Sequence, residues 1–189
     1  MTQFGYLQQA SADALDDNAL ALALQALVVG VTGLDPTLVR PRWQPQMPKR
    51  PSAQTNWAAI GVTTYIAQDY PEYVQDEELS GTLRRLEHVH VLAIFYGPSS
   101  SNYASLFRDG LYIEQNLAVL YRSGLKLISA DDITHAPEEI NTGWIPRSDV
   151  PLRFTRMINR VYPTRTITSA EVIVTADTGE SIDTIITQE

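Results

Sequence analysis

The stretch Leu38–Val62, LVRPRWQPQMPKRPSAQTNWAAIGV, decides how the chain is organised, because it is extended, basic and aromatic. Four prolines lie inside it, and Pro36 stands just before it. Proline fixes φ and pushes the preceding residue toward extended geometry, so this stretch is predicted to be an extended arm and not a helix. Two large aromatic residues, Trp43 and Trp57, are costly to leave in water, so we expect the arm to dock on another surface.

On the N-terminal side of the arm, the sequence predicts one helix over about residues 14–29. Aspartates at its start favour a helix N-terminus, and Gly30 and Gly33 followed by Pro36 mark its end. The second half of this helix is apolar on nearly every face, which predicts burial on more than one side. A central core helix and a helix that contacts another subunit both fit this pattern.

On the C-terminal side, the pattern of apolar residues predicts a sheet. Strands are expected at Leu38–Trp43, Trp57–Ile66 and Leu152–Tyr162. Arg84–Tyr96 becomes continuously apolar, as a central strand buried on both faces does. The acidic stretch Asp69–Ser80 is predicted to be a turn.

A second helix is predicted over about 102–122, capped by one of the serines at 99–101 and ended by Gly124. A short strand and a polar loop over 130–148 follow it. Two β-branched runs then predict a hairpin with strands near 169–175 and 181–187, around a turn at Asp177-Thr178-Gly179.

Together these elements predict an α/β fold of the α+β kind, in which a mixed, mostly antiparallel sheet is flanked by two helices. We expect one domain over residues 1–189, with the arm at 36–55 and the hairpin at 168–189. The hairpin is short of core partners at a chain end. We therefore expect it to pair with the sheet edge of a neighbouring subunit.

Charge is distributed unevenly along the chain, whose net charge is −8. Residues 36–68 carry four basic and no acidic residues, whereas the remainder carries 10 basic against 22 acidic residues, a net −12. An acidic body argues against a dedicated nucleic-acid reader, and it fits either ordinary solubility or a surface that faces DNA without binding it. With no signal-peptide pattern and no apolar run long enough to cross a bilayer, the sequence favours a soluble intracellular protein.

Residues that could support chemistry are few. The absence of cysteine excludes disulfides, thiolate catalysis and Cys-ligated zinc. His88 and His90 share one face of a predicted strand and could ligate a metal, but no third ligand stands at a recognisable spacing. His135, near Asp131 and Asp132, could act as an acid or base, yet no nucleophile motif accompanies it. The inventory predicts a protein that is not an enzyme and needs no cofactor.

Basic residues gather in two places that suit contacts between subunits. The first lies in the arm. The second follows residue 146 and includes Arg156 and Arg160, which share one side of a predicted strand. Contact with acidic surface on another subunit and a solvated sheet face both fit the second group. The candidate interface residues are Arg40, Arg42, Trp43, Lys49, Arg50, Arg156 and Arg160.

The pieces LVRPRWQP (38–45), PKRP (48–51) and NWAAIGV (56–62) resemble a family of bacteriophage neck or tail terminator proteins. The order of the other elements is similar too: an N-terminal helix, a Gly-Leu-Asp-Pro turn, the strand VHVLAIFYG (89–97) and a helix begun by Ser and Asn. The resemblance covers about residues 14–165, and its specific part is Arg40–Val62. The C-terminal hairpin has no match in it.

The resemblance implies a structural subunit of the virion tail or neck, assembled in the host cytoplasm. Such subunits form a ring, commonly a hexamer, on the head-proximal end of the tail tube. The ring ends tube polymerisation and presents a head–tail joining surface to neck or connector proteins, while DNA passes through its channel without specific binding. The sheath protein is a further candidate partner. Another connector, stopper or tail-completion protein is the alternative, and a small metal-dependent enzyme is a distant one.

For such a ring, the sequence suggests how neighbouring copies meet. A ring needs heterologous interfaces that close, and an extended arm reaches a neighbour readily. We expect Arg40–Ala53 to lie across an adjacent subunit or the tube, with Trp43 as its anchor. Trp57 is expected to point into the core of its own subunit instead.

Overall fold

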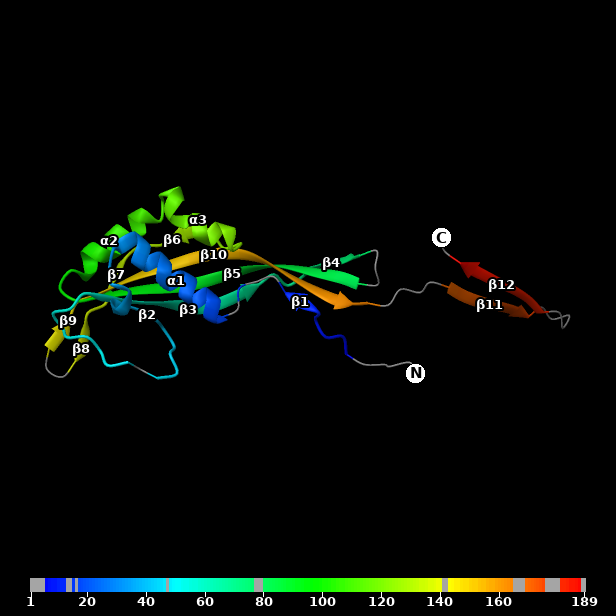
Figure 1. Ribbon diagram of the computed structural model, residues 1–189, viewed down its shortest axis with the longest axis horizontal. Coiled ribbons are helices and arrows are strands. Elements are labelled where there is room, and N and C mark those ends of the chain that lie inside the picture. The colour runs from blue at the N-terminus through cyan, green and yellow to red at the C-terminus, as the bar shows by residue number, and fades with distance from the viewer. Residues whose placement is uncertain are drawn as a thin grey trace.

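The computed structural model describes residues 6–12, 15, 17–46, 48–76, 80–140, 143–164, 169–175 and 181–187 (Figure 1). Its helices are α1 (Asp17–Thr32), α2 (Ser100–Gly110) and α3 (Glu114–Arg122), and Pro36–Leu38 forms a 3-10 turn. The strands are β1 (Ser11–Ala12), β2 (Val39–Pro41), β3 (Trp57–Ala67), β4 (Glu72–Gln75), β5 (Ser80–Tyr96), β6 (Lys126–Ala130), β7 (Thr134–His135), β8 (Glu138–Ile140), β9 (Gly143–Ile145), β10 (Arg147–Pro163), β11 (Ser169–Thr175) and β12 (Ser181–Thr187).

The main sheet is mixed and mostly antiparallel, with the central order β1-β10-β5-β3-β2. Strands β4, β6 and β7 add to it beside β5 and β10, and β2 is the parallel neighbour of β3. The central strands β5 and β10 are each 17 residues long and are paired along their whole length, from Arg147 opposite Tyr96 to Pro163 opposite Ser80. The predicted α+β fold is confirmed.

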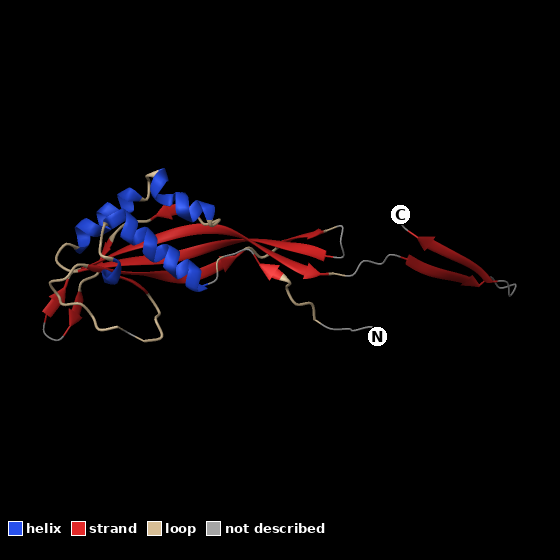
Figure 2. Ribbon diagram, viewed as in Figure 1, coloured by secondary structure: helices blue, strands red, loops and turns tan. Residues whose placement is uncertain are grey.

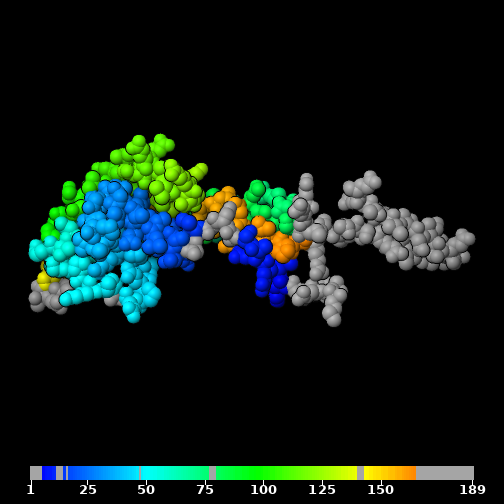
Figure 3. All heavy atoms as spheres, in the orientation of Figure 1, coloured from blue at the N-terminus to red at the C-terminus, as the bar shows by residue number. Residues whose placement is uncertain are grey.

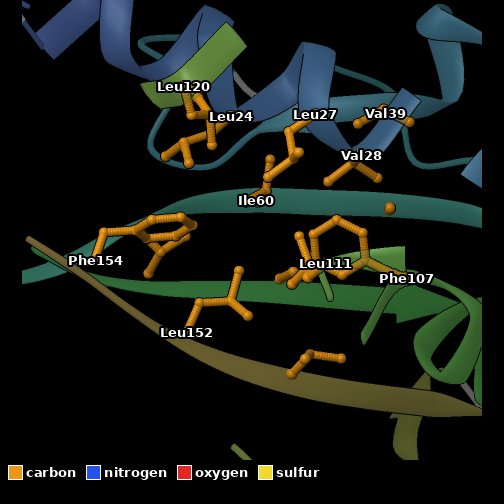
Figure 4. Packing of buried hydrophobic residues seen from close by; sticks show 14 of the residues in the cluster. Leu24, Leu27, Val28, Val39, Ile60, Phe107, Leu111, Leu120, Leu152 and Phe154 are labelled. Atoms are coloured by element: carbon orange, nitrogen blue, oxygen red, sulfur yellow. The ribbon is translucent and has the colours of Figure 1, made fainter. Parts of the chain in front are cut away.

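The three helices gather over one face at one end of this sheet, and the sheet continues beyond them (Figure 2). Alternation along β5 sends Val89, Val91 and Phe95 into the layer between helices and sheet, where all three are buried. Phe107 of α2 packs on Phe95 from the helix side. Leu24 of α1 belongs to the same cluster, beside Leu120 of α3 (Figure 4). The opposite face of the sheet carries no helix in the described residues, and it holds the site described below.

Helix α1 is amphipathic in this structure. Leu20, Leu24 and Val28 are buried against the sheet, whereas Leu22 is exposed on the other side. The helix runs three residues beyond the predicted end at 29, through Gly30 to Thr32. Of the two predicted stop signals, Gly33 is the one that ends it, with a positive φ of 68° and an N–H that donates to the carbonyl of Val29. The core position of α1 is therefore established, and a contact of its outer side with another subunit stays a prediction.

The predicted single helix over 102–122 is wrong, because the chain breaks between α2 and α3. At the break Val31 of α1 packs so close to Gly110 that a Cβ on that residue would overlap the valine methyl. The amide of Asn116 donates to the carbonyl of Gly110 at 2.8 Å, which satisfies an acceptor freed at the end of α2. The end of α3 agrees with the sequence, since Gly124 has a φ of 76° and the Leu125 N–H folds back to the Leu120 carbonyl.

Three other expectations need correction. The acidic stretch 69–80 contains a real strand, β4, which pairs with the start of β5. The loop over 130–148 contains the short strands β7, β8 and β9. Strand β5 is buried on both faces only over its last four residues, 93–96, while His88 is exposed.

The C-terminal hairpin has the predicted strands, with Ser169 opposite Thr187 and Thr175 opposite Ser181. Its predicted turn, Asp177-Thr178-Gly179, lies outside the described residues. Within the described residues β11 and β12 pair with each other and not with the main sheet. The described helices are all too short, or not apolar enough over a sufficient length, to cross a membrane.

Candidate binding surface at the arm

The arm folds back over the helix-free face of its own sheet, since Arg42 lies against Gly61 and the space under the arm is lined by Trp57, Ala59 and Tyr96. Figure 3 shows the atoms of the arm (cyan) beside those of α1 (blue) at one end of the molecule. The backbone N–H of Arg42 donates to the carbonyl of Ile60, and the indole Nε1 of Trp43 donates to the carbonyl of Val62 at 3.1 Å. Gly61 makes this close approach possible, because a Cβ there would lie only 2.9 Å from the Cβ of Arg42. The arm is therefore held against β3 by backbone and side chain together.

Two stacked aromatic rings form the floor of the surface. Trp57 and Tyr96 are direct partners in the β3–β5 ladder, and their rings are parallel within 7° with centroids 4.1 Å apart. Both residues lie on the face away from the helices, and Trp57 is half-buried there. The prediction that Trp57 points into the core is wrong, since alternation along β3 sends Ala58 and Ile60 to the core instead.

Arginine side chains surround this aromatic floor. The guanidinium carbon of Arg50 lies 5.0 Å from the Tyr96 ring centroid, and that of Arg147 lies 5.8 Å from it. Arg40 approaches the Trp57 ring at 5.7 Å, and its Nη1 donates to the carbonyl of Lys49. A cation over an aromatic face is attracted by the ring quadrupole, so the floor collects positive charge.

Carboxylates balance part of this charge. Arg50 donates to Glu138 of β8 at 2.9 Å, and this hydrogen bond lowers the pKa of the Glu138 carboxyl below its usual value. Arg147 makes two parallel hydrogen bonds to Asp149, at 2.7 and 2.6 Å, which raise the pKa of the Arg147 guanidinium. Burial raises the pKa of the Tyr96 hydroxyl, so the ring stays neutral in the middle of the cluster.

Exposed Trp43 and half-buried Arg42 form the rim of the surface. The Trp43 side chain is 72% exposed, and the Arg42 guanidinium stacks on it at 4.4 Å. Trp43 also has a positive φ of 60°, a strained conformation for a large side chain. Within the described residues, the Nη1 of Arg42 is buried without a hydrogen-bond partner, and burial lowers the pKa of this guanidinium. The expectation that Trp43 points outward is confirmed.

Between the arm and the floor lies a groove of about 480 Å³, lined by both tryptophans and three of the arginines. Sequence reasoning identified the arm residues, and it counted Arg147 in the second basic group without placing it beside the arm. It missed Tyr96, at the end of a core strand, and Glu138, in an unrecognised short strand. The ladder that places Arg147 opposite Tyr96 joins residues 51 positions apart, which no local pattern records.

The second predicted group, Arg156 and Arg160, lies elsewhere on β10. Arg156 is paired within its own chain: its Nε donates to Glu87 at 2.7 Å and its Nη1 donates to the Leu15 carbonyl. Its guanidinium also covers the Tyr65 ring at 5.3 Å. Arg160 lies on the same side of the strand, half-buried, opposite Leu83. A role for either residue between subunits stays a prediction.

The structure does not bring the candidate catalytic residues together. His88 and His90 share a face as predicted, but no three metal-ligating side chains cluster in the part of the chain that is described. His135 contacts the buried Ser148 hydroxyl at 3.2 Å, whereas Asp131 is paired with Arg153. The groups that do converge, at the arm, are guanidinium, indole, phenol and carboxylate groups, which suit binding.

The fold and this surface define an α+β protein whose distinctive site is a basic, aromatic contact surface. The family described as phage neck terminator protein matches residues 18–184, which is most of the chain. The chain belongs to this phage neck terminator family. Its place is accordingly the tail or neck of a virion, among other phage tail and neck proteins. No curated protein matches the chain.

Proposed function

We propose that this chain forms a ring, with six copies as the expected number, that caps the head-proximal end of the phage tail tube. The ring ends tail polymerisation and provides the head–tail joining surface. Its partners are the tail tube protein and the neck or connector proteins, with the sheath protein as a further candidate. The chain acts as a structural protein without catalysis or cofactor, and DNA passes through the channel without specific binding.

The observation that carries this proposal, beside the family, is the way Trp43 is presented. A 72% exposed indole is held in a strained backbone conformation by the Nε1 hydrogen bond to Val62 and by the stacked Arg42. Fixed, exposed tryptophans flanked by arginines are typical anchors of protein interfaces. The arm therefore serves as a rigid contact element toward a neighbour or the tube.

The test is truncation of this anchor. Trp43→Ala should raise the subunit concentration needed for ring assembly at least tenfold, since an interface anchor contributes on the order of 2 kcal/mol or more to the free energy of association. The subunit fold should be unchanged, because the indole is outside the core. Tyr112→Ala is the matched control: this ring is 71% exposed, but it lies between α2 and α3 on the helix side.

Mass photometry and negative-stain microscopy, with and without tail tubes, give the readout, and circular dichroism checks the fold. Normal assembly and tube capping by Trp43→Ala would show that the arm is not an assembly element. A twelvefold ring, in place of a sixfold one, would favour the alternative role of a connector at the neck.

A further inference from the structure

The groove at the arm has the chemistry of a site for carboxylates. The charged side chains that line it are Arg40, Arg42 and Arg50 against Glu138, an excess of two positive charges. Because hydrogen bonds between guanidinium and carboxylate groups are strong, a ligand that brings carboxylate oxygens to these arginines is favoured.

The C-terminal hairpin is acidic and carries no basic residue. Residues 166–189 contain five acidic and no basic residues. In the hairpin register Glu171 lies opposite Ile185 and Asp183 lies opposite Ile173, so both acids fall on the same side of the two-stranded ribbon. The uncharged residues Ala170, Val172 and Val174 fall on the other side. A lone hairpin is marginally stable in water, so this one gains from docking.

The two acids of the hairpin cannot reach the groove of their own chain together. The near end of the groove is Trp43, which bonds the carbonyl of Val62, and Val62 is level with Val91 of β5 and Leu152 of β10. Strand β10 ends at Pro163, 11 residues beyond Leu152, which is roughly 36 Å at about 3.3 Å per residue. Glu171 is eight residues beyond Pro163 and lies at most about 29 Å from it, so it falls short of even the near end. A hairpin that brings both acids to the groove therefore comes from another copy.

We propose that the arm groove receives the acidic C-terminal hairpin of a second copy of this chain, with Glu171 and Asp183 facing its arginines. Such a contact is heterologous, because one end of each subunit binds the opposite end of the next. It gives a ring where the rotation between copies closes and an open filament where it does not. The proposal rests on the proposed function only in that the ring supplies the second copy.

Because the chain has no cysteine, disulfide cross-linking reports this contact directly. Full-length Gln44→Cys and Asp183→Cys proteins are prepared separately, mixed under assembly conditions and oxidised. Gln44 lines the groove, so a disulfide between residues 44 and 183 of different copies is expected. The matched control replaces Gln44→Cys by Gln115→Cys, also an exposed glutamine but on α3, which should cross-link at least tenfold less.

Charge reversal provides a second measurement. Glu171→Lys together with Asp183→Lys should weaken self-association at least tenfold, whereas Glu114→Lys on α3 should leave it unchanged. A ring that forms without the 44–183 cross-link and tolerates the double reversal would overturn the hairpin proposal and leave the proposed function standing. Monomers under every condition, with no cross-link, would overturn both. A 44–183 cross-link without a closed ring would support the hairpin contact and count against the ring.

Discussion

The buried ion pair between Arg156 and Glu87 gives the sharpest test of how the sheet is stabilised. Both side chains are 12% exposed, and the Arg156 Nε lies 2.7 Å from a Glu87 carboxylate oxygen. Glu87→Gln keeps the shape of the side chain and leaves the Arg156 charge buried without its counterion. Breaking a buried pair in this way costs about 3–5 kcal/mol of unfolding free energy. Because both side chains keep some contact with water, we expect a value near the lower end of this range.

The same strand supplies a matched comparison. Arg153 of β10 pairs with Asp131 at 3.2 Å, but these side chains are 48% and 41% exposed. Surface pairs contribute about 0–1 kcal/mol, so Asp131→Asn should destabilise the protein by no more than that. At about 2–4 °C per kcal/mol for a chain of this size, a loss of about 3 kcal/mol lowers the melting temperature by roughly 6–12 °C.

Urea titration and thermal unfolding of the monomeric protein, followed by circular dichroism, measure both variants. A third variant, Glu87→Leu with Arg156→Met, removes both charges and should recover most of the stability, because replacing a whole buried pair by apolar residues is often neutral. Equal destabilisation by Glu87→Gln and Asp131→Asn would contradict this prediction, since burial would then not decide the strength of the pair.

Three further predictions follow from the same structure. Gly97→Ala should cost about 2 kcal/mol or more in urea unfolding, because Gly97 has a φ of 103° and a Cβ there would lie 2.6 Å from the Thr55 carbonyl oxygen. The hydrogen bond from Arg50 lowers the pKa of Glu138, so the stability from this pair is present above the ordinary glutamate pKa of 4.5 and is lost as pH falls below it. Glu138→Gln should therefore reduce the loss of unfolding free energy below pH 4.5. Burial and a hydrogen bond to Asp17 raise the pKa of Tyr65 to about 12, so its contribution is complete below pH 10 and is lost toward pH 12. Absorbance titration near 295 nm should lose a late-titrating tyrosinate in Tyr65→Phe.

The elements that could be predicted from sequence are those whose signal is local. The arm follows from the fixed φ of its prolines, and the end of α1 follows from Gly33. The hairpin follows from two β-branched runs, and its register matches the predicted strands. In each case a few neighbouring residues restrict the backbone on their own, so no knowledge of the tertiary structure is needed.

What escaped prediction depends on contacts between distant segments. Nothing local in Leu111–Ile113 breaks a helix, and the break arises where Val31 of α1 packs on Gly110. Strand β4 is only four residues long and forms because β5 extends far enough to pair with it. The aromatic floor of the site requires the register that sets Trp57 beside Tyr96, and the sequence alone leaves that register open.

The length of the β5–β10 ladder has a mechanical consequence. If neighbours hold the subunit at its two ends, tension runs parallel to these strands across 17 facing residue pairs. Force in that direction shears many cross-strand hydrogen bonds at once, whereas force across the strands opens them one after another. The subunit would then resist extension along its length, and under tension the contacts with its neighbours would fail before the β5–β10 ladder.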